Sequence, residues 1–140
     1  MVTRADAITQ TQKTSVIFSD YTLSFLYHPV TKELIVVKNE EAVKQAIRNC
    51  ILTAVGERFF SPFFGSNIYK SLFEPFSPFF AEDLLKYITL SIAQFEPRCQ
   101  LLNVTPIVNE DANEVSVNIV FSLINSLTPV SFNVFLRRVR

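Results

Sequence analysis

The segment Ser77–Arg98, SPFFAEDLLKYITLSIAQFEPR, carries a clear helix pattern with a defined start and a defined end. Ser77 is expected to cap the free amide groups of the first turn, and Pro78 suits that turn. Pro97 cannot continue a helix and disfavours the helical conformation in Glu96, so the helix is expected to end just before them. Its apolar residues recur every three or four positions and form one stripe: Ala81, Leu84, Leu85, Ile88, Ile92 and Phe95.

The charges of Glu96-Pro97-Arg98 need partners at this helix end. A carboxylate there faces the negative end of the helix dipole, at a cost of up to about 1 kcal/mol when exposed. Residues two apart do not face each other on a helix, so Arg98 pairs with Glu96 only if the proline bend brings it round. The three residues are therefore either a helix stop with solvated charges or a docking point for another protein. In the second case, groups of the other protein would satisfy both charges, and removing the Glu96 and Arg98 side chains would leave the stability of the monomer unchanged.

An earlier helix is predicted from about Glu40 to Val55, with Asn39 as its cap and Gly56 as its terminator. Its inward stripe is Val43, Ile47, Cys50, Ile51 and Ala54. A shorter helix is possible over Asn67–Phe73.

Strand patterns lie on both sides of the helical region. Tyr21–Tyr27 and Leu34–Val37 read as a hairpin before it. After it come Leu101–Val108, with Pro106 marking an edge or a bulge, and two alternating runs: Val115, Val117, Ile119, Phe121 and Leu123, then Val130, Phe132, Val134 and Leu136. This order predicts an α+β fold, with two main helices packed on a mainly antiparallel sheet of about five strands.

The segment from Phe59 to Phe80 holds eight of the fourteen phenylalanines of the chain. Aromatic rings are mostly buried, which favours the interpretation that these rings fold inward as core. The alternative leaves some of them exposed as anchors for a partner: Phe59, Phe63, Phe76 or Phe79.

Composition narrows the class of protein. Residues 1–15 are polar and are predicted to form an extended arm, and residues 16–140 a single domain. Apolar residues make up 49% of the chain and charged residues 19%, which favours lasting contacts with other proteins. Thirteen basic and thirteen acidic residues cancel, so neither nucleic acid nor a membrane is expected as a partner.

Few residues are available for chemistry. With one histidine, His28, and two glycines, the sequence predicts no metal site, no nucleotide cradle and no cofactor. Cys50 and Cys99 are expected to be free thiols made in a reducing cytoplasm. Three arginines near the carboxyl end, Arg137, Arg138 and Arg140, are interpreted as the solvated end of the last strand and not as a nucleic-acid site.

Four short motifs follow one another along the chain: Gly56-Glu57-Arg58, Phe64-Gly65, Leu72-Phe73-Glu74-Pro75 and Glu96-Pro97-Arg98. In this order, and with the helix and strand patterns around them, residues 20–140 resemble the gene-25-type baseplate wedge proteins of contractile phage tails. That family also includes the related subunit of type VI secretion machines. The resemblance implies a non-enzymatic subunit of the virion, present in six copies around the tail and made in the host cytoplasm.

The resemblance also implies partners and the residues that meet them. Glu96, Pro97 and Arg98 are expected to contact the helical core bundle of the wedge. Glu57 and Arg58, beside the end of the first helix, are expected either to support this contact or to belong to the internal packing. Further expected partners are the sheath subunit and the proteins that begin the tail tube. The sheath would add strands to one sheet edge. That edge is either the one marked by Pro106 or the last strand, with Val130, Phe132, Val134 and Leu136.

Two alternatives of other classes remain. The resembled family extends to a bacterial anti-adaptor, so the chain could be a regulatory module that binds a protein partner. Some members have been labelled lysozymes, and a glycosidase needs only two carboxylates. The candidates are Glu57, Glu74, Glu82, Asp83 and Glu96, although the chain has no tryptophan to stack on a sugar.

Overall fold

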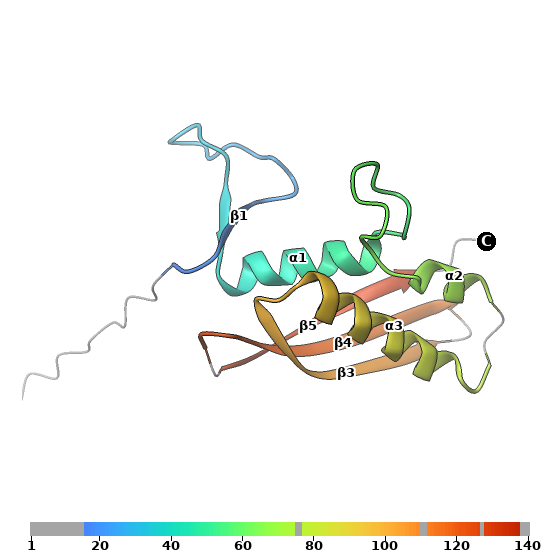
Figure 1. Cartoon of the computed structure of the whole chain (residues 1–140). Helices are drawn as coiled ribbons and strands as arrows, with labels where there is room; N and C mark the ends of the chain where they lie inside the picture. Colours follow the sequence, from blue (N-terminus) through green and yellow to red (C-terminus); the bar gives the residue numbers. More distant parts are fainter. Residues whose placement is uncertain (1–15, 75–76, 110–111, 127, 138–140) are drawn as a thin grey trace, which may run out of the picture.

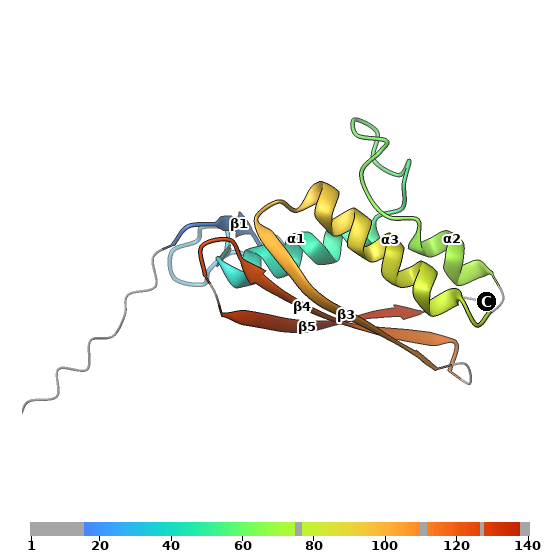
Figure 2. The ribbon, with the colours of Figure 1, turned by 60° about the horizontal axis from the view of Figure 1, so that its bottom comes forward.

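The computed structural model describes residues 16–74, 77–109, 112–126 and 128–137, so the predicted arm of residues 1–15 lies outside the described residues. A three-stranded antiparallel sheet forms one layer, in the order β3-β4-β5. Its strands are β3 (Cys99–Asn109), β4 (Glu114–Leu123) and β5 (Pro129–Arg137). Two helices, α1 (Glu40–Leu52) and α3 (Phe80–Phe95), cover one face of this sheet (Figures 1 and 2).

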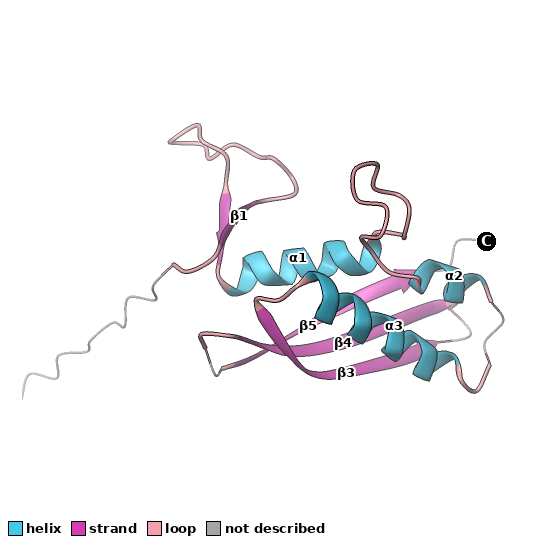
Figure 3. Cartoon of the chain, viewed as in Figure 1, coloured by secondary structure: helices cyan, strands magenta, loops and turns pink. Residues whose placement is uncertain are grey.

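The remaining elements lie beside these two layers. Strands β1 (Ser19–Tyr21) and β2 (Val36–Lys38) pair only with each other, in a separate two-stranded sheet (Figure 3). The short helix α2 (Ile68–Phe73) precedes α3, close to the predicted Asn67–Phe73. The α+β class is therefore confirmed, whereas the single sheet of about five strands is wrong.

The hairpin stays apart because it has little apolar surface to bury against the main sheet. All of β1 and most of β2 are exposed. The positive φ angle of Phe25 interrupts the predicted run Tyr21–Tyr27, and beyond it the described residues of the hairpin form an isolated bridge between Tyr27 and Leu34. A strand needs an apolar face and extended backbone to join a sheet, and this segment has neither over its whole length.

The helix ends differ from the sequence prediction in three places. Helix α3 ends at Phe95 as predicted but begins at Phe80, because Ser77 accepts the Phe80 amide through its backbone carbonyl in a preceding turn. Helix α1 ends at Leu52, since Ala54 leaves the helix to bridge Ser66. The Asn39 side chain does not cap α1; its Oδ1 accepts the amides of Ile17 and Phe18, at 2.9 and 3.2 Å.

The core lies between the helices and the sheet. Central strand β4 contributes Val115, Val117, Ile119 and Phe121, all fully buried, and the predicted stripes of α1 and α3 pack on them. From the α3 stripe only Leu85 is exposed. Val130, Phe132, Val134 and Leu136 of β5 also point into this core. One buried face thus accounts for the alternation seen in the sequence.

The expectation that the phenylalanines between the helices form core is wrong for most of them. Phe59, Phe60 and Phe63 are 96%, 102% and 81% exposed, and Phe73 and Phe79 are exposed as well. Phe80 is buried and Phe64 is half-buried, while Phe76 lies outside the described residues. The β-branched and leucine side chains of β4 and the two helices already fill the core, so the loop rings have no place in it.

Gly65 is where the chain returns from this loop to the end of α1. Its φ is +117°, and an added Cβ would collide with the backbone carbonyl of Thr53. Gly56 also has a positive φ, +92°, but no atom lies within 4 Å of its added Cβ. A side chain at Gly56 would meet backbone strain alone, whereas a side chain at Gly65 would meet backbone strain and a steric collision.

We predict that Gly65→Ala lowers the free energy of unfolding by about 3 kcal/mol and Gly56→Ala by about 1 kcal/mol. Both substitutions place alanine at positive φ, and only Gly65→Ala forces two backbones apart. Urea unfolding followed by circular dichroism measures both values. Equal losses in the two variants would show that the collision with Thr53 is relieved at no cost.

Candidate functional site

The end of α3 is closed by an ion pair between two residues of the Glu96-Pro97-Arg98 motif. The Glu96 amide makes the last helical hydrogen bond, to Ile92 at 2.9 Å, and Pro97 then turns the chain. Arg98 points back: its Nε donates to Glu96 Oε1 at 2.6 Å and its Nη2 to Oε2 at 2.7 Å. This is the bidentate geometry in which a guanidinium matches a carboxylate.

The pair is buried on one side and open on the other. Glu96 is only 4% exposed, whereas the Arg98 side chain retains 31% of its surface. The hydrogen bond to Glu96 raises the pKa of Arg98 above its ordinary value, so the guanidinium stays charged. The expectation that other chains satisfy both charges is therefore wrong, because each charge satisfies the other inside this chain. The cation expected near Glu96 is Arg98 itself.

Neighbouring contacts fix the position of Arg98. Its carbonyl accepts the amide of Ile124 at 3.2 Å, which ties the motif to the end of β4. Its guanidinium carbon lies 5.7 Å from the centre of the Phe18 ring. Within the part of the chain that the structure describes, Nη1 of Arg98 makes no hydrogen bond. The exposed edge of the Arg98 guanidinium is thus a hydrogen-bond donor whose position is fixed by its neighbours.

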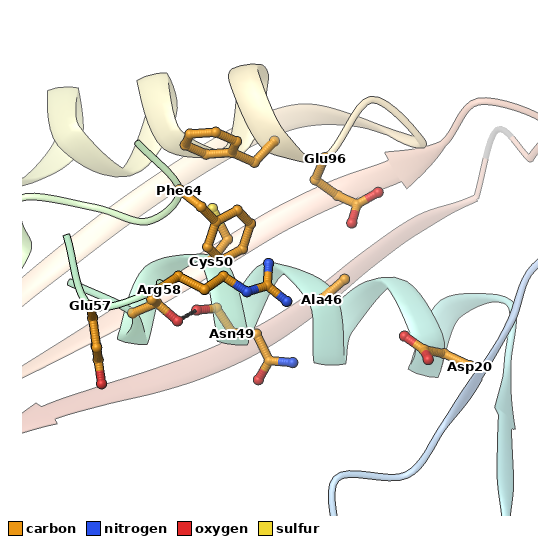
Figure 4. Close-up of a pocket in the computed structure, with 10 residues that line it drawn as sticks. Asp20, Ala46, Asn49, Cys50, Glu57, Arg58, Phe64 and Glu96 are labelled. Atoms are coloured by element: carbon orange, nitrogen blue, oxygen red, sulfur yellow. Dashed lines mark hydrogen bonds between the residues drawn. The ribbon is translucent and has the colours of Figure 1, made fainter. Parts of the chain in front are cut away.

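A cavity of about 510 Å³ lies next to this pair (Figure 4). Helix α1 forms its floor, Phe64 and Phe95 form a wall, and Asp20 and Glu96 lie at one end. The lining residues are Asp20, Ala46, Asn49, Cys50, Thr53, Glu57, Arg58, Phe64, Phe95 and Glu96. Residues from β1, α1, the loop after α1 and α3 therefore meet at one place.

Glu57 and Arg58 line the same cavity. The guanidinium carbon of Arg58 lies 4.6 Å from the centre of the Phe64 ring, which in turn lies 5.0 Å from the ring of Phe95. Glu57 turns back to its own loop, where Oε2 accepts the Ala54 amide at 2.9 Å. The structure thus brings all five predicted docking residues into one region, although Glu57 has an internal role.

Both cysteines are free thiols and lie near this region. Burial, followed by the Glu96 carboxylate, raises the pKa of Cys50 to about 11 and that of Cys99 to about 11. Each thiol donates to a backbone carbonyl, Cys50 to Ser91 and Cys99 to Glu96, at 3.5 Å. Neutral, hydrogen-bonded thiols of this kind are poor nucleophiles.

Of the five carboxylates considered for a glycosidase, only Glu57 and Glu96 line the cavity. Glu74, Glu82 and Asp83 do not line the cavity, and the last two lie in the first turn of α3, at the opposite end from Glu96. Both oxygens of Glu96 are held by Arg98. Asp20, which sequence reasoning missed, lines the cavity, but its charge has no motif around it in the sequence.

The described residues form neither a metal-ligand cluster nor a membrane-spanning helix. No group of three or more histidine, cysteine, aspartate or glutamate residues in this part of the chain could hold a metal ion. Among the helices that the structure describes, none has the length and apolarity needed to cross a membrane.

The fold is shared with solved tail proteins. A crystal structure of a Geobacter sulfurreducens protein, described as a candidate tail lysozyme, superposes with a TM-score of 0.70 at 23% identity, covering 77% of this chain and 98% of that one. A subunit of the anti-feeding prophage baseplate superposes with a TM-score of 0.60 at 19% identity, covering 84% of this chain and 83% of that one. A chain of the postcontracted pyocin R2 baseplate superposes with a TM-score of 0.57 at 19% identity, covering 66% of this chain and 93% of that one. The architecture is thus one found in contractile-tail baseplates.

Sequence comparison gives the family. The profile of the baseplate wedge protein gp25 family matches residues 37–126. The baseplate wedge protein gp25 of Enterobacteria phage T4 is 32% identical over 85 residues, which are 61% of this chain and 64% of that protein, just under two thirds of its length. The chain belongs to the gp25 family of baseplate wedge proteins.

We predict that Arg98→Ala lowers the free energy of unfolding by about 2 kcal/mol, because it leaves the buried Glu96 carboxylate without its cation. The value is below that of a fully buried pair, since Arg98 is partly solvated. The double variant Glu96→Gln/Arg98→Ala, which leaves no buried charge, is expected to recover part of the loss. Thermal or urea unfolding of the three proteins measures this, and an unchanged Arg98→Ala protein would contradict it.

Proposed function

We propose that this chain is a non-enzymatic joint of the baseplate: it docks on the helical core bundle of the wedge through Arg98 and offers a sheet edge on which the sheath begins. The observation that carries the docking step is the bidentate Glu96–Arg98 pair, whose buried side fixes the guanidinium and whose open side faces out. A guanidinium fixed in advance loses little entropy when it binds an acceptor on another chain.

The roles of the motif residues follow from their burial. Glu96 is a positioning residue, because its carboxylate is enclosed and fully used by Arg98. Arg98 is the contacting residue, with its free amino group available to a carboxylate or a helix carboxyl end of the core bundle. Arg58, exposed and stacked on Phe64, supplies a second cation on the other side of the cavity.

The same contacts favour a mechanical role over a lytic one. Glycoside hydrolysis needs one carboxyl group free to give a proton and a second free to act as base or nucleophile. Glu96 is neutralised by Arg98, and Glu57 accepts an amide of its own loop. The resemblance to a candidate tail lysozyme therefore extends to the fold and not to a carboxylate pair poised for that reaction.

Strand β5 is the better template for the sheath. Both β3 and β5 are edge strands of the three-stranded sheet. Strand β3 is interrupted twice, by the register shift between Leu101 and Asn103 and by Pro106, which has no amide to offer. Strand β5 pairs with β4 without a shift along its whole length. An uninterrupted edge offers a regular row of backbone donors and acceptors.

Any such pairing would use the β5 backbone and not the predicted side chains. Val130, Phe132, Val134 and Leu136 point into the core, so a sheath strand cannot contact them. The outward side chains are Ser131, Asn133 and Phe135. Six copies of this joint around the tail, next to the proteins that begin the tube, would give the sheath a ring of starting strands.

The docking step is tested by Arg98→Lys, measured as affinity for the co-expressed core-bundle proteins of the same tail. A lysine keeps a positive charge for Glu96 but has no second amino group that faces outward, so the fold is expected to survive and affinity to fall at least tenfold. Arg48→Lys, at an exposed position on α1, is the matched control and is expected to bind normally. Wild-type affinity of Arg98→Lys would show that Arg98 does not make the contact.

The sheath step is tested by hydrogen–deuterium exchange of the intact protein, alone and with its sheath subunit. Edge amides of β5 are expected to exchange quickly in the free protein and to slow by at least tenfold on binding, because they gain strand partners. Strand β3 is the internal control. Protection of β3 instead of β5 would move the template to the other edge, and protection of neither strand would end the strand-addition mechanism.

A further inference from the structure

The loop that follows α1, residues 56–64, carries the three most exposed aromatic rings in the part of the chain that the structure describes. We call it the phenylalanine loop. It stands out from the helical layer at the carboxyl end of α1, away from the sheet (Figures 1 and 2). Phe59, Phe60 and Phe63 are exposed almost completely, at 96%, 102% and 81%. The Glu96–Arg98 docking proposal leaves these three rings unused.

The loop is held in shape by its own backbone. The amide of Gly56 donates to the carbonyl of Pro62 at 2.8 Å, which closes the loop at its base. Inside it, Ser61 donates to Arg58 at 3.2 Å and Phe64 donates to Ser61 at 3.0 Å. The ring of Phe64 points the other way and anchors the loop on Phe95. A loop fixed in this way presents its rings without a large ordering cost on binding.

The exposed apolar area is large for one loop. A phenylalanine side chain buries at least about 150 Å² when it is fully enclosed, so the three rings expose roughly 400 to 500 Å². That area reaches the size of the largest apolar patch on a typical monomer, which is often functional. The tip is also uncharged, because no aspartate, glutamate, histidine, lysine or arginine occurs between Arg58 and Lys70. A surface of this kind fits an apolar socket and not a charged one.

We infer that the phenylalanine loop is an apolar anchor that inserts Phe59, Phe60 and Phe63 into an uncharged groove on another baseplate protein. This inference rests on the proposed assembly function but not on the contact made by Arg98. The polar base of the loop, Glu57 and Arg58, would form the solvated rim around the buried rings. Aromatic anchors inside a polar rim are the arrangement of binding hot spots.

A second copy of this chain is a poor match as the partner. Two cavities on the described residues, of about 510 and 490 Å³, are lined in part by charged side chains. The first contains Asp20, Glu57 and Arg58, and the second Glu41, Lys44 and Arg48. Inserting rings there would remove those charges from water without replacing their partners. Neither cavity is the uncharged socket that the rings fit, and we therefore propose a different baseplate protein as the partner.

A lipid surface is also a poor match. Interfacial segments that insert aromatic rings into anionic membranes usually carry several lysines or arginines beside them. The loop carries one arginine, and its guanidinium is stacked on Phe64 over the cavity. Membership of a baseplate wedge family places this chain among protein neighbours.

The experiment replaces the rings and leaves the rest of the site intact. The triple variant Phe59→Ser/Phe60→Ser/Phe63→Ser is expected to melt like the wild type, because the three rings touch solvent, and to bind the co-expressed wedge proteins of the same tail at least a hundredfold more weakly. Phe25→Ser is the matched control, since this ring is 64% exposed on the hairpin, outside the phenylalanine loop. Wild-type affinity of the triple variant would overturn the inference.

A second measurement identifies the occupant. A photoreactive benzoyl-phenylalanine replaces Phe60 in assembled baseplates, and mass spectrometry locates the cross-linked residues. Cross-links to apolar residues of a different baseplate protein are expected. Cross-links to a second copy of this chain, to lipid, or to nothing at all would each reject the proposed partner. Arg98→Lys is measured separately, which distinguishes the two proposals. If the triple variant binds normally and Arg98→Lys binds weakly, the anchor is rejected and the docking function is retained. If neither the wild type nor any variant binds, the assembly function itself is rejected.

Discussion

The two hydrogen bonds from Arg98 to Glu96 hold the junction on which the arrangement of the layers depends. A carboxylate at the carboxyl end of a helix is unfavourable, and a buried one more so, unless a cation reaches it. Pro97 ends α3 and turns the chain, so that the cation two residues later can do so. Strand β3 begins at the next residue. Pro97 therefore stops the helix, and the ion pair closes the junction at which the sheet starts.

The sheet built from this junction is asymmetric. Helices α1 and α3 cover one face, and central strand β4 supplies most of the buried side chains. The other face and both edge strands have no cover among the described residues. Ile107 and Phe135 are accordingly exposed on it. A fold with one packed face and open edges is suited to being completed by neighbours, which agrees with its place in a baseplate family.

Charge and exposure in the cavity region support the contact function that we propose. Glu96 is neutralised by a neighbour in its own chain, and burial keeps both cysteine thiols protonated near neutral pH. What the region leaves open is the outer edge of Arg98, the stacked Arg58 and the rings of the phenylalanine loop. These are groups that bind another surface: two cations beside a rigid apolar projection.

The sequence by itself determined the elements whose signals are local. The stripe of α3, its end at Phe95 and the alternation in β4 and β5 all follow from the spacing of side chains, and the order of the motifs indicated the family. Only the tertiary structure decided which groups meet. It separated the first hairpin from the main sheet, paired Glu96 with Arg98, brought Asp20 to the cavity and turned Phe59, Phe60 and Phe63 outward. Local propensity fixes the backbone of each segment, whereas contacts depend on how loops close and on which side chains have already filled the core.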